Sequence, residues 1–366
     1  MEYRKLPHGS ELINPLGIGL GAIQTRTKEE IEEVITVALN NGINFFDLCA
    51  GGSKVYEPFG KAIQGKRNSI YIELHFGAVY NEKGEYGWSR NLEEIKKTFE
   101  WAMNLFGTDY VDFGMLHCID SIEDLNDVIN NGIMDYVKSL KEQGVVRHIG
   151  FSSHTPSVCE KLLDFGIFDI FLFSINPAYD YELGDEYGIG SLDERVQLLN
   201  RCVREGVSIS VMKPFFGGLL LDENKSPFKK ALTSLQCLKY AMDRPGVISV
   251  CPGVTSIDEL LDILKFNNAT YLELDYSILS SVAITKASGI CVYCNHCMPC
   301  PIGIDIALVN KYYDLALAGD EMAKNHYTKL SKNAGDCIKC GHCDKRCPFK
   351  VKQQNRMKEI NEYFSK

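Results

Sequence analysis

The chain has 366 residues, enough for one large domain and one small one. Apolar residues make up 45% of it and charged residues 24%, a globular composition that argues against disorder. The net charge of −9 is uneven, because the stretch from Thr285 onward carries 13 Lys and Arg against 8 Asp and Glu. The acidic remainder argues against nucleic acid as a partner, since phosphate binding needs a basic face. We find no run of about 18 apolar residues and no signal peptide, so we expect no membrane span and a cytoplasmic location.

Strand-like and helix-like segments alternate after an expected hairpin over residues 2–14, which turns at His8 and Gly9. The eight apolar, strand-like runs are residues 15–23, 43–49, 69–76, 110–117, 148–154, 167–176, 207–214 and 247–254. Amphipathic stretches separate them, with capping boxes at Thr27/Glu30, Ser191/Glu194 and Ser256/Glu259. This alternation predicts an α/β fold, a (β/α)8 TIM barrel over residues 1–284, with the hairpin covering its N-terminal end. A doubly wound open sheet is the alternative.

Polar side chains stand at the C-terminal ends of these predicted strands, where the chemistry of such barrels is found. They are Asp47, His75, His117, Ser152, Ser153, His154, Asn176, Lys213 and the turn of Gly253, Val254, Thr255 and Ser256. Imidazoles titrate near neutral pH, which makes His75 and His117 candidates for proton transfer. Lys213 is a candidate for binding a substrate carboxylate or phosphate or stabilising an oxyanion, with a structural salt bridge as the alternative. Cys49 and Cys118 lie beside these candidates, which leaves them open as reactive thiols.

Eight of the fourteen cysteines are crowded between Cys291 and Cys347. Two-residue gaps let three thiolates of one loop bind one [4Fe–4S] cluster, while the fourth cysteine of the run reaches the other cluster. The predicted first cysteine set is Cys291, Cys294, Cys297 and Cys347. The predicted second cysteine set is Cys300, Cys337, Cys340 and Cys343. Paired zinc sites are the alternative, but the spacing fits them poorly. The pattern resembles bacterial dicluster ferredoxins and predicts a small, α-rich, ferredoxin-like domain over residues 285–366.

Several short motifs, in their order, resemble the aldo-keto reductase family, and in particular the branch whose barrel is followed by a ferredoxin domain. The motifs are residues 4–6, 16–21, 42–47, 110–117, 148–154 and 212–214. The resemblance spans essentially the whole chain. It implies carbonyl reduction with NAD(P)H by a catalytic Asp, Tyr, Lys and His, of which Asp47 and His117 are present.

The chain departs from the family at the other two catalytic positions. Gly52 stands where the resemblance places the Tyr, and His75 stands where it places the Lys. Gly52 has no side chain that could donate a proton, and the side chain of His75 is shorter and less basic than that of a lysine. Tyr56 is close in sequence, which leaves open whether it replaces the missing Tyr.

The sequence also lacks some of the cofactor-binding residues that the resemblance implies. The nicotinamide-binding Gln of the family falls near Leu172, and the turn after the last strand lacks the basic residues paired with the NADP 2′-phosphate. A helix that begins at Ser256 offers free N–H groups to an anion, whereas Asp258 and Glu259 would repel a 2′-phosphate. NAD(P)H is therefore possible but not clearly indicated, and its expected contacts are Ser152, Ser153, Asn176, Gly253, Thr255 and Ser256.

These features together predict an oxidoreductase that reduces a small organic substrate at the barrel mouth. Clusters transfer single electrons whereas nicotinamide donates hydride, so the clusters need a one-electron acceptor or an intermediary such as a flavin. We expect electrons to arrive through the clusters from a ferredoxin or flavodoxin, and protons to come from Asp47, His75 and His117. One alternative is an NAD(P)H-dependent carbonyl reductase coupled to ferredoxin, and another is a non-catalytic redox sensor or electron-transfer subunit.

Overall fold

The computed structural model describes residues 3–49, 52–81, 84–281, 289–293, 296–317 and 321–365. Cys294 and the predicted domain boundary between residues 284 and 285 lie outside these residues. None of the described helices is long and apolar enough to cross a membrane.

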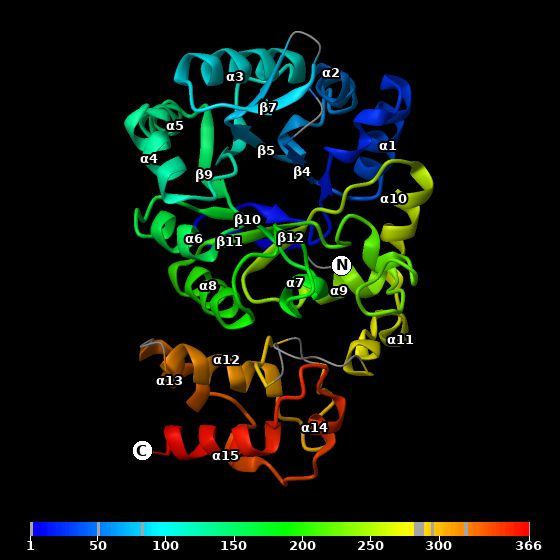
Figure 1. Cartoon of the computed structure of the whole chain (residues 1–366), viewed down its shortest axis with the longest axis vertical. Coiled ribbons are helices and arrows are strands. Elements are labelled where there is room, and N and C mark those ends of the chain that lie inside the picture. Colours follow the sequence, from blue (N-terminus) through cyan, green and yellow to red (C-terminus); the bar gives the residue numbers. More distant parts are fainter. Residues whose placement is uncertain are drawn as a thin grey trace.

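Eight parallel strands form a barrel (Figure 1). They are β3 (Ile18–Gly19), β4 (Phe45–Leu48), β5 (Tyr71–Phe76), β8 (Val111–Leu116), β9 (Val146–Ser152), β10 (Ile170–Ser174), β11 (Ser208–Met212) and β12 (Val247–Val250). Their spatial order is β12-β11-β10-β9-β8-β5-β4-β3, and parallel bridges from Leu16 to Val250 and from Gly19 to Gly253 join its two ends. The predicted (β/α)8 barrel is confirmed, because each of the eight apolar runs overlaps one of these strands.

Helices surround the barrel strands, and apolar side chains on most of these helices and on the strands form the main core. They are α1 (Lys28–Asn40), α2 (Gly52–Ala62), α3 (Leu92–Phe106), α4 (Ile122–Asn130), α5 (Ile133–Glu142), α6 (Pro156–Leu163), α7 (Pro177–Asp180), α8 (Leu192–Glu205), α9 (Ser234–Met242), α10 (Ile257–Leu264) and α11 (Tyr271–Leu274). Short 3-10 helices span Ala22–Thr25, Arg67–Ser69, Leu219–Leu221, Lys265–Asn268 and Ser277–Ser281.

Local capping sets where several of these helices begin. The predicted capping boxes at α1 and α8 are present. The side chains of Thr27 and Ser191 accept from the amide of the glutamate three residues on, and the carboxylate of that glutamate accepts from the backbone amide of Thr27 or Ser191. The box predicted at α10 is half formed. Ser256 accepts from the Glu259 amide, but the Glu259 carboxylate accepts from the amide of Thr255 instead of that of Ser256.

Two antiparallel hairpins are attached to the barrel. The predicted one consists of β1 (Arg4–Lys5) and β2 (Leu12–Ile13), which pair antiparallel. Its Leu6 and Ile13 are fully buried against residues of the barrel interior such as Phe45, so it covers this core as expected. A second hairpin, which the sequence analysis did not predict, consists of β6 (Ala78–Tyr80) and β7 (Tyr86–Trp88) and directly follows β5.

A small helical domain packs on one side of the barrel, next to α7 and α8 (Figure 1). Its helices are α12 (Ile306–Leu317), α13 (Glu321–Thr328), α14 (His342–Arg346) and α15 (Gln353–Phe364), with a 3-10 helix at Ala334–Asp336. The contact with the barrel is apolar and aromatic, and the rings of Tyr181 and Phe349 lie 4.8 Å apart at its centre. Polar contacts flank it, since Arg244 donates to the Val292 carbonyl at 2.8 Å.

Candidate active site

Three predicted catalytic residues meet at the ends of neighbouring strands. The parallel order places β4, β5 and β8 side by side, so Asp47, His75 and His117 lie next to one another on the rim. Nε2 of His75 is 3.0 Å from Oδ1 of Asp47, and the Nδ1 atoms of His75 and His117 are 3.1 Å apart. All three side chains are buried, with exposed fractions of 4% to 7%.

Tyr86 extends this group into a chain of four hydrogen-bonded side chains. Strand β7 holds its hydroxyl 2.5 Å from Nε2 of His117. With Asp47 ionised, one assignment of protons satisfies every atom. Tyr86 O–H donates to Nε2 of His117, and His117 Nδ1–H then donates to His75. The remaining proton, on Nε2 of His75, is donated to Asp47. We call these four residues the proton chain.

Burial keeps two members of the proton chain, His117 and Tyr86, in the protonation states that this assignment requires. Burial, and to a lesser degree the neighbouring His75, lowers the pKa of His117 well below its usual value, so the imidazole is neutral. Burial also raises the pKa of Tyr86, so its side chain keeps its proton. Sequence reasoning missed Tyr86. The signal was present, because Asn81 and Gly84, residue types common in hairpin turns, stand between two tyrosine-bearing segments.

The hairpin that supplies Tyr86 also explains the absence of a tyrosine at position 52. A Cβ atom on Gly52 would lie 3.1 Å from the ring of Tyr80, and the φ of Gly52 is +53°. Tyr80 therefore occupies the space next to this position. Tyr56 points elsewhere, because its hydroxyl bonds to Tyr80 at 2.9 Å and to the Leu48 carbonyl at 3.1 Å. The Tyr56 hydroxyl is therefore bonded to Tyr80 and to the backbone, and not to Asp47, His75 or His117.

A second polar group surrounds Lys213 on the same rim. The Nζ atom of Lys213 is 2.9 Å from Nε2 of His154 and 3.6 Å from the ring centre of Tyr187. The other ring nitrogen of His154, Nδ1, lies 2.9 Å from Oδ2 of Asp120. Lys213 has a φ of +57°, a strained conformation for a residue other than glycine, which is often found at functional sites. Burial lowers the pKa of Lys213.

Three of the predicted cofactor contacts are used to hold this rim together. The Ser152 hydroxyl accepts from the amide of Cys118 at 2.8 Å, and the Ser153 hydroxyl donates to Asp120 at 3.1 Å. The side-chain amide of Asn176 donates to the backbone carbonyl of Lys213 at 3.0 Å. All three side chains are almost fully buried, so they support the backbone around Lys213. A contact to a cofactor by these residues remains a prediction.

The remaining predicted cofactor contacts lie at an open pocket of about 670 Å³ beside the N-terminus of α10. Gly253 and Thr255 line it together with Lys213, whereas Ser256 caps the helix. Three carboxylates also line this pocket, those of Asp258, Glu259 and Asp262. Glu259 Oε2 accepts from the Thr255 amide at 2.7 Å, so this amide is already hydrogen-bonded within the chain.

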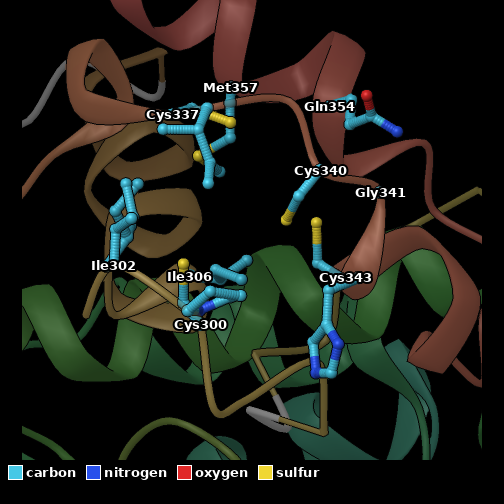
Figure 2. A pocket seen from close by; sticks show the side chains of 13 residues that line it. Cys300, Ile302, Ile306, Cys337, Cys340, Gly341, Cys343, Gln354 and Met357 are labelled. Carbon is cyan, nitrogen blue, oxygen red and sulfur yellow. The ribbon is translucent and has the colours of Figure 1, made fainter.

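The second cysteine set comes together in the small domain. Cys300, Cys337, Cys340 and Cys343 line one cavity with isoleucines and Met357, and Figure 2 shows their sulfurs facing it. This is the arrangement expected if Cys300 crosses over to join the second run. Four thiols around an apolar cavity fit the ligand requirements of a [4Fe–4S] cluster.

Three members of the first cysteine set are described, and Cys294 is not. Cys347 and Cys291 lie against the apolar cluster that joins the small domain to the barrel, whereas Cys297 is buried in the core of the small domain. Sγ of Cys347 accepts from the Val351 amide at 3.4 Å, and Sγ of Cys291 accepts from the Gln353 side chain at 3.7 Å. N–H groups directed at cysteine sulfur are typical of cluster ligands.

Comparisons with known proteins agree with both parts of this architecture. The aldo/keto reductase family profile matches residues 15–236, and a 4Fe-4S dicluster domain profile matches residues 290–352. An uncharacterized oxidoreductase, YqkF of Bacillus subtilis, is 23% identical over 291 residues, which cover 74% of this chain and 93% of that protein. The chloroplastic pyridoxal reductase of Arabidopsis thaliana is 23% identical over 338 residues, covering 76% and 87%.

Among solved structures, the aldo-keto reductase AKR11C1 from Bacillus halodurans in its holo form superposes with a TM-score of 0.62. It is 21% identical, and the match covers 78% of this chain and 98% of that one, which supports the fold. The match of the first profile to more than half of the chain establishes the family. The protein belongs to the aldo/keto reductase family and carries a C-terminal 4Fe-4S dicluster domain.

Proposed function

We propose that the protein reduces a small organic substrate at the barrel mouth, with electrons delivered through its dicluster domain and the final proton delivered by Tyr86. The observation that carries this proposal is the proton chain of Tyr86, His117, His75 and Asp47. By the family resemblance, His75 takes the position of the Lys, and in this proposal Tyr86 takes over the role of the missing Tyr. The outer member of the proton chain is a hydroxyl that can give its proton to the substrate and regain one from solvent, while the neutral imidazole behind it holds the hydroxyl in position.

The proposed direction of electron flow is from the second cysteine set to the first. Iron–sulfur clusters transfer electrons one at a time. Cys340 of the second set is exposed, so an electron partner such as a ferredoxin or flavodoxin can approach it. Cys347 of the first set lies in the apolar cluster shared with the barrel, close to Phe349 and Tyr181. A flavin is no part of this proposal.

Lys213 completes the proposed site as the group that binds a negatively charged or carbonyl oxygen of the substrate. Its ammonium donates to His154, which is itself fixed by Asp120, so its position is set before substrate binds. A substrate with a carboxylate or a carbonyl oxygen fits this arrangement. The proposal also places the protein in the reducing cytoplasm, where the cysteines of both sets stay reduced and available to bind clusters.

An NAD(P)H-dependent carbonyl reductase is the second candidate, and the pocket beside α10 favours it. This pocket runs from Lys213 to Thr255 and is large enough for part of a nucleotide. The relatives named as an oxidoreductase and a pyridoxal reductase support reductase chemistry in general.

The two candidates differ in what reoxidises reduced clusters. Holoenzyme is reduced with dithionite under anaerobic conditions and mixed with a panel of small aldehydes, ketones and unsaturated carboxylates, while the cluster absorbance near 400 nm is followed. We expect reoxidation by at least one compound, slowed about 100-fold or more by Tyr86→Phe. Tyr80→Phe is the matched control, since its hydroxyl belongs to the same hairpin but bonds to Tyr56 and the Cys49 carbonyl. Turnover of about 1 per second with NADPH in cluster-free protein would support the second candidate instead.

A further inference from the structure

A cysteine lies beside the two imidazoles of the proton chain. Sγ of Cys49 is 3.8 Å from Nδ1 of His117, and the ligand-type atoms of Cys49, His75 and His117 all lie within 4.8 Å of one another. One sulfur and two imidazole nitrogens form a donor set that suits zinc-class cations. We propose that Cys49, His75 and His117 form a binding site for a divalent cation of the zinc class.

The distances among these atoms match a tetrahedral site. Bond lengths of about 2.0–2.1 Å to nitrogen and about 2.3 Å to sulfur place two tetrahedral nitrogen ligands about 3.3 Å apart, and nitrogen and sulfur about 3.6 Å apart. The corresponding distances here are 3.1 Å between the two Nδ1 atoms and 3.8 Å between Cys49 and His117. Shifts of a few tenths of an ångström bring these two pairs to coordination distances, and the ligand-type atoms of Cys49 and His75 lie within 4.8 Å of each other.

The outer nitrogens of both imidazoles are already held by oxygen atoms. Asp47 bonds to Nε2 of His75, and Tyr86 bonds to Nε2 of His117. Metal-ligating histidines almost always have such a partner on the nitrogen that faces away from the metal. With the cation bound through Nδ1, both Nε2–H groups donate outward, to the Asp47 carboxylate and the Tyr86 oxygen. On cation binding, the Nδ1 proton of His117 moves to Nε2, the Cys49 thiol releases its proton to solvent, and Tyr86 keeps its own hydroxyl proton.

A neighbouring group of similar composition lacks these properties. Cys118, Asp120 and His154 also place ligand-type atoms within 4.8 Å of one another. Both ring nitrogens of His154 are engaged, however, one by Asp120 and the other by the Lys213 ammonium at 2.9 Å. An ammonium at that distance repels a cation. The two groups therefore differ in function, and Cys118 serves as a matched control for Cys49.

Three protein ligands leave the fourth tetrahedral position open to water or to a substrate oxygen, as in catalytic zinc sites. The inference rests on the same rim as the proposed function and adds a Lewis acid to it.

Zinc binding is measured on anaerobic holoenzyme that contains about eight irons per chain, the content of two [4Fe–4S] clusters. The protein is treated with a chelator, titrated with Zn²⁺ and desalted, and bound metal is counted by mass spectrometry. We expect about one zinc per chain in the wild type and in Cys118→Ser, and an affinity at least tenfold weaker in Cys49→Ser. Equal zinc binding by both variants, or no binding by the wild type, overturns the proposal.

X-ray absorption at the zinc edge decides the question without any variant. We expect one sulfur at about 2.3 Å and two or three nitrogen or oxygen atoms at about 2.0 Å. A shell of several sulfurs would place the zinc at cluster cysteines and overturn the site. Cluster reoxidation by substrate is followed in the same preparations. Zinc binding without reoxidation contradicts the proposed function alone, and reoxidation by zinc-free enzyme at the full rate contradicts a role for the cation alone.

Discussion

The carboxylates beside α10 predict that the barrel discriminates against NADPH in favour of NADH. The perturbation that tests this is Glu259→Gln, which removes one negative charge and keeps the size of the side chain. Oε2 of Glu259 lies 2.7 Å from the Thr255 amide and 3.0 Å from its hydroxyl, at the place where the family resemblance puts the 2′-phosphate. NADH has no phosphate at this position, so the substitution affects it little.

The magnitude follows from the charges involved. A phosphate dianion about 6 Å from one carboxylate is repelled by about 1.4 kcal/mol in a medium with a dielectric constant of about 80, which is a factor of about ten in affinity. At about 0.15 M salt the Debye length is about 8 Å, which roughly halves this energy. We therefore expect Glu259→Gln to tighten NADPH binding about three- to tenfold, with the larger value at low salt.

Isothermal titration of anaerobic holoenzyme with each nucleotide measures this preference directly. Glu273→Gln is the matched control, because Glu273 caps Thr270 at the start of α11 with the same pair of hydrogen bonds, outside the pocket. Tighter binding of NADPH than of NADH by the wild type would contradict the predicted preference for NADH. So would a ratio of the two affinities that Glu259→Gln leaves unchanged.

Three further predictions concern the clusters and stability. Cys300→Ala should remove the cluster of the second cysteine set and leave the first intact by electron paramagnetic resonance, and loss of the first alone would contradict the crossed pairing. Asp180→Asn should lower the melting temperature by at least about 5 °C, because it leaves the buried Arg195 without its anionic partner; an unchanged melting temperature would show that the pair is dispensable. Burial lowers the pKa of His148, but hydrogen bonds to Asp169 and a neighbouring glutamate outweigh this and raise it. The stability advantage of the wild type over His148→Asn should thus be greatest below about pH 6.5 and shrink as pH rises, and thermal melts in which it grows with pH would contradict this.

The sequence alone indicated the barrel and its covering hairpin and predicted the two cysteine sets, because short-range patterns encode each of these features. Eight apolar runs alternating with helical segments leave little choice of architecture, and the parallel strands oblige their C-terminal ends to meet. Asp47, His75 and His117 therefore meet on one rim, as expected. The two-residue gaps between cysteines likewise reveal a metal-binding pattern without any tertiary information.

Only the tertiary structure decided which side chains work with these residues. Tyr86 reaches His117 because the β6–β7 hairpin folds back over the rim, and the same hairpin places Tyr80 in the space beside Gly52. Glu259 satisfies the Thr255 amide instead of completing the expected capping box. In each case, the choice of hydrogen-bond partner depends on where a loop lies in space. Residue spacing along the chain does not specify that position, because many loop paths are compatible with the same strand and helix pattern.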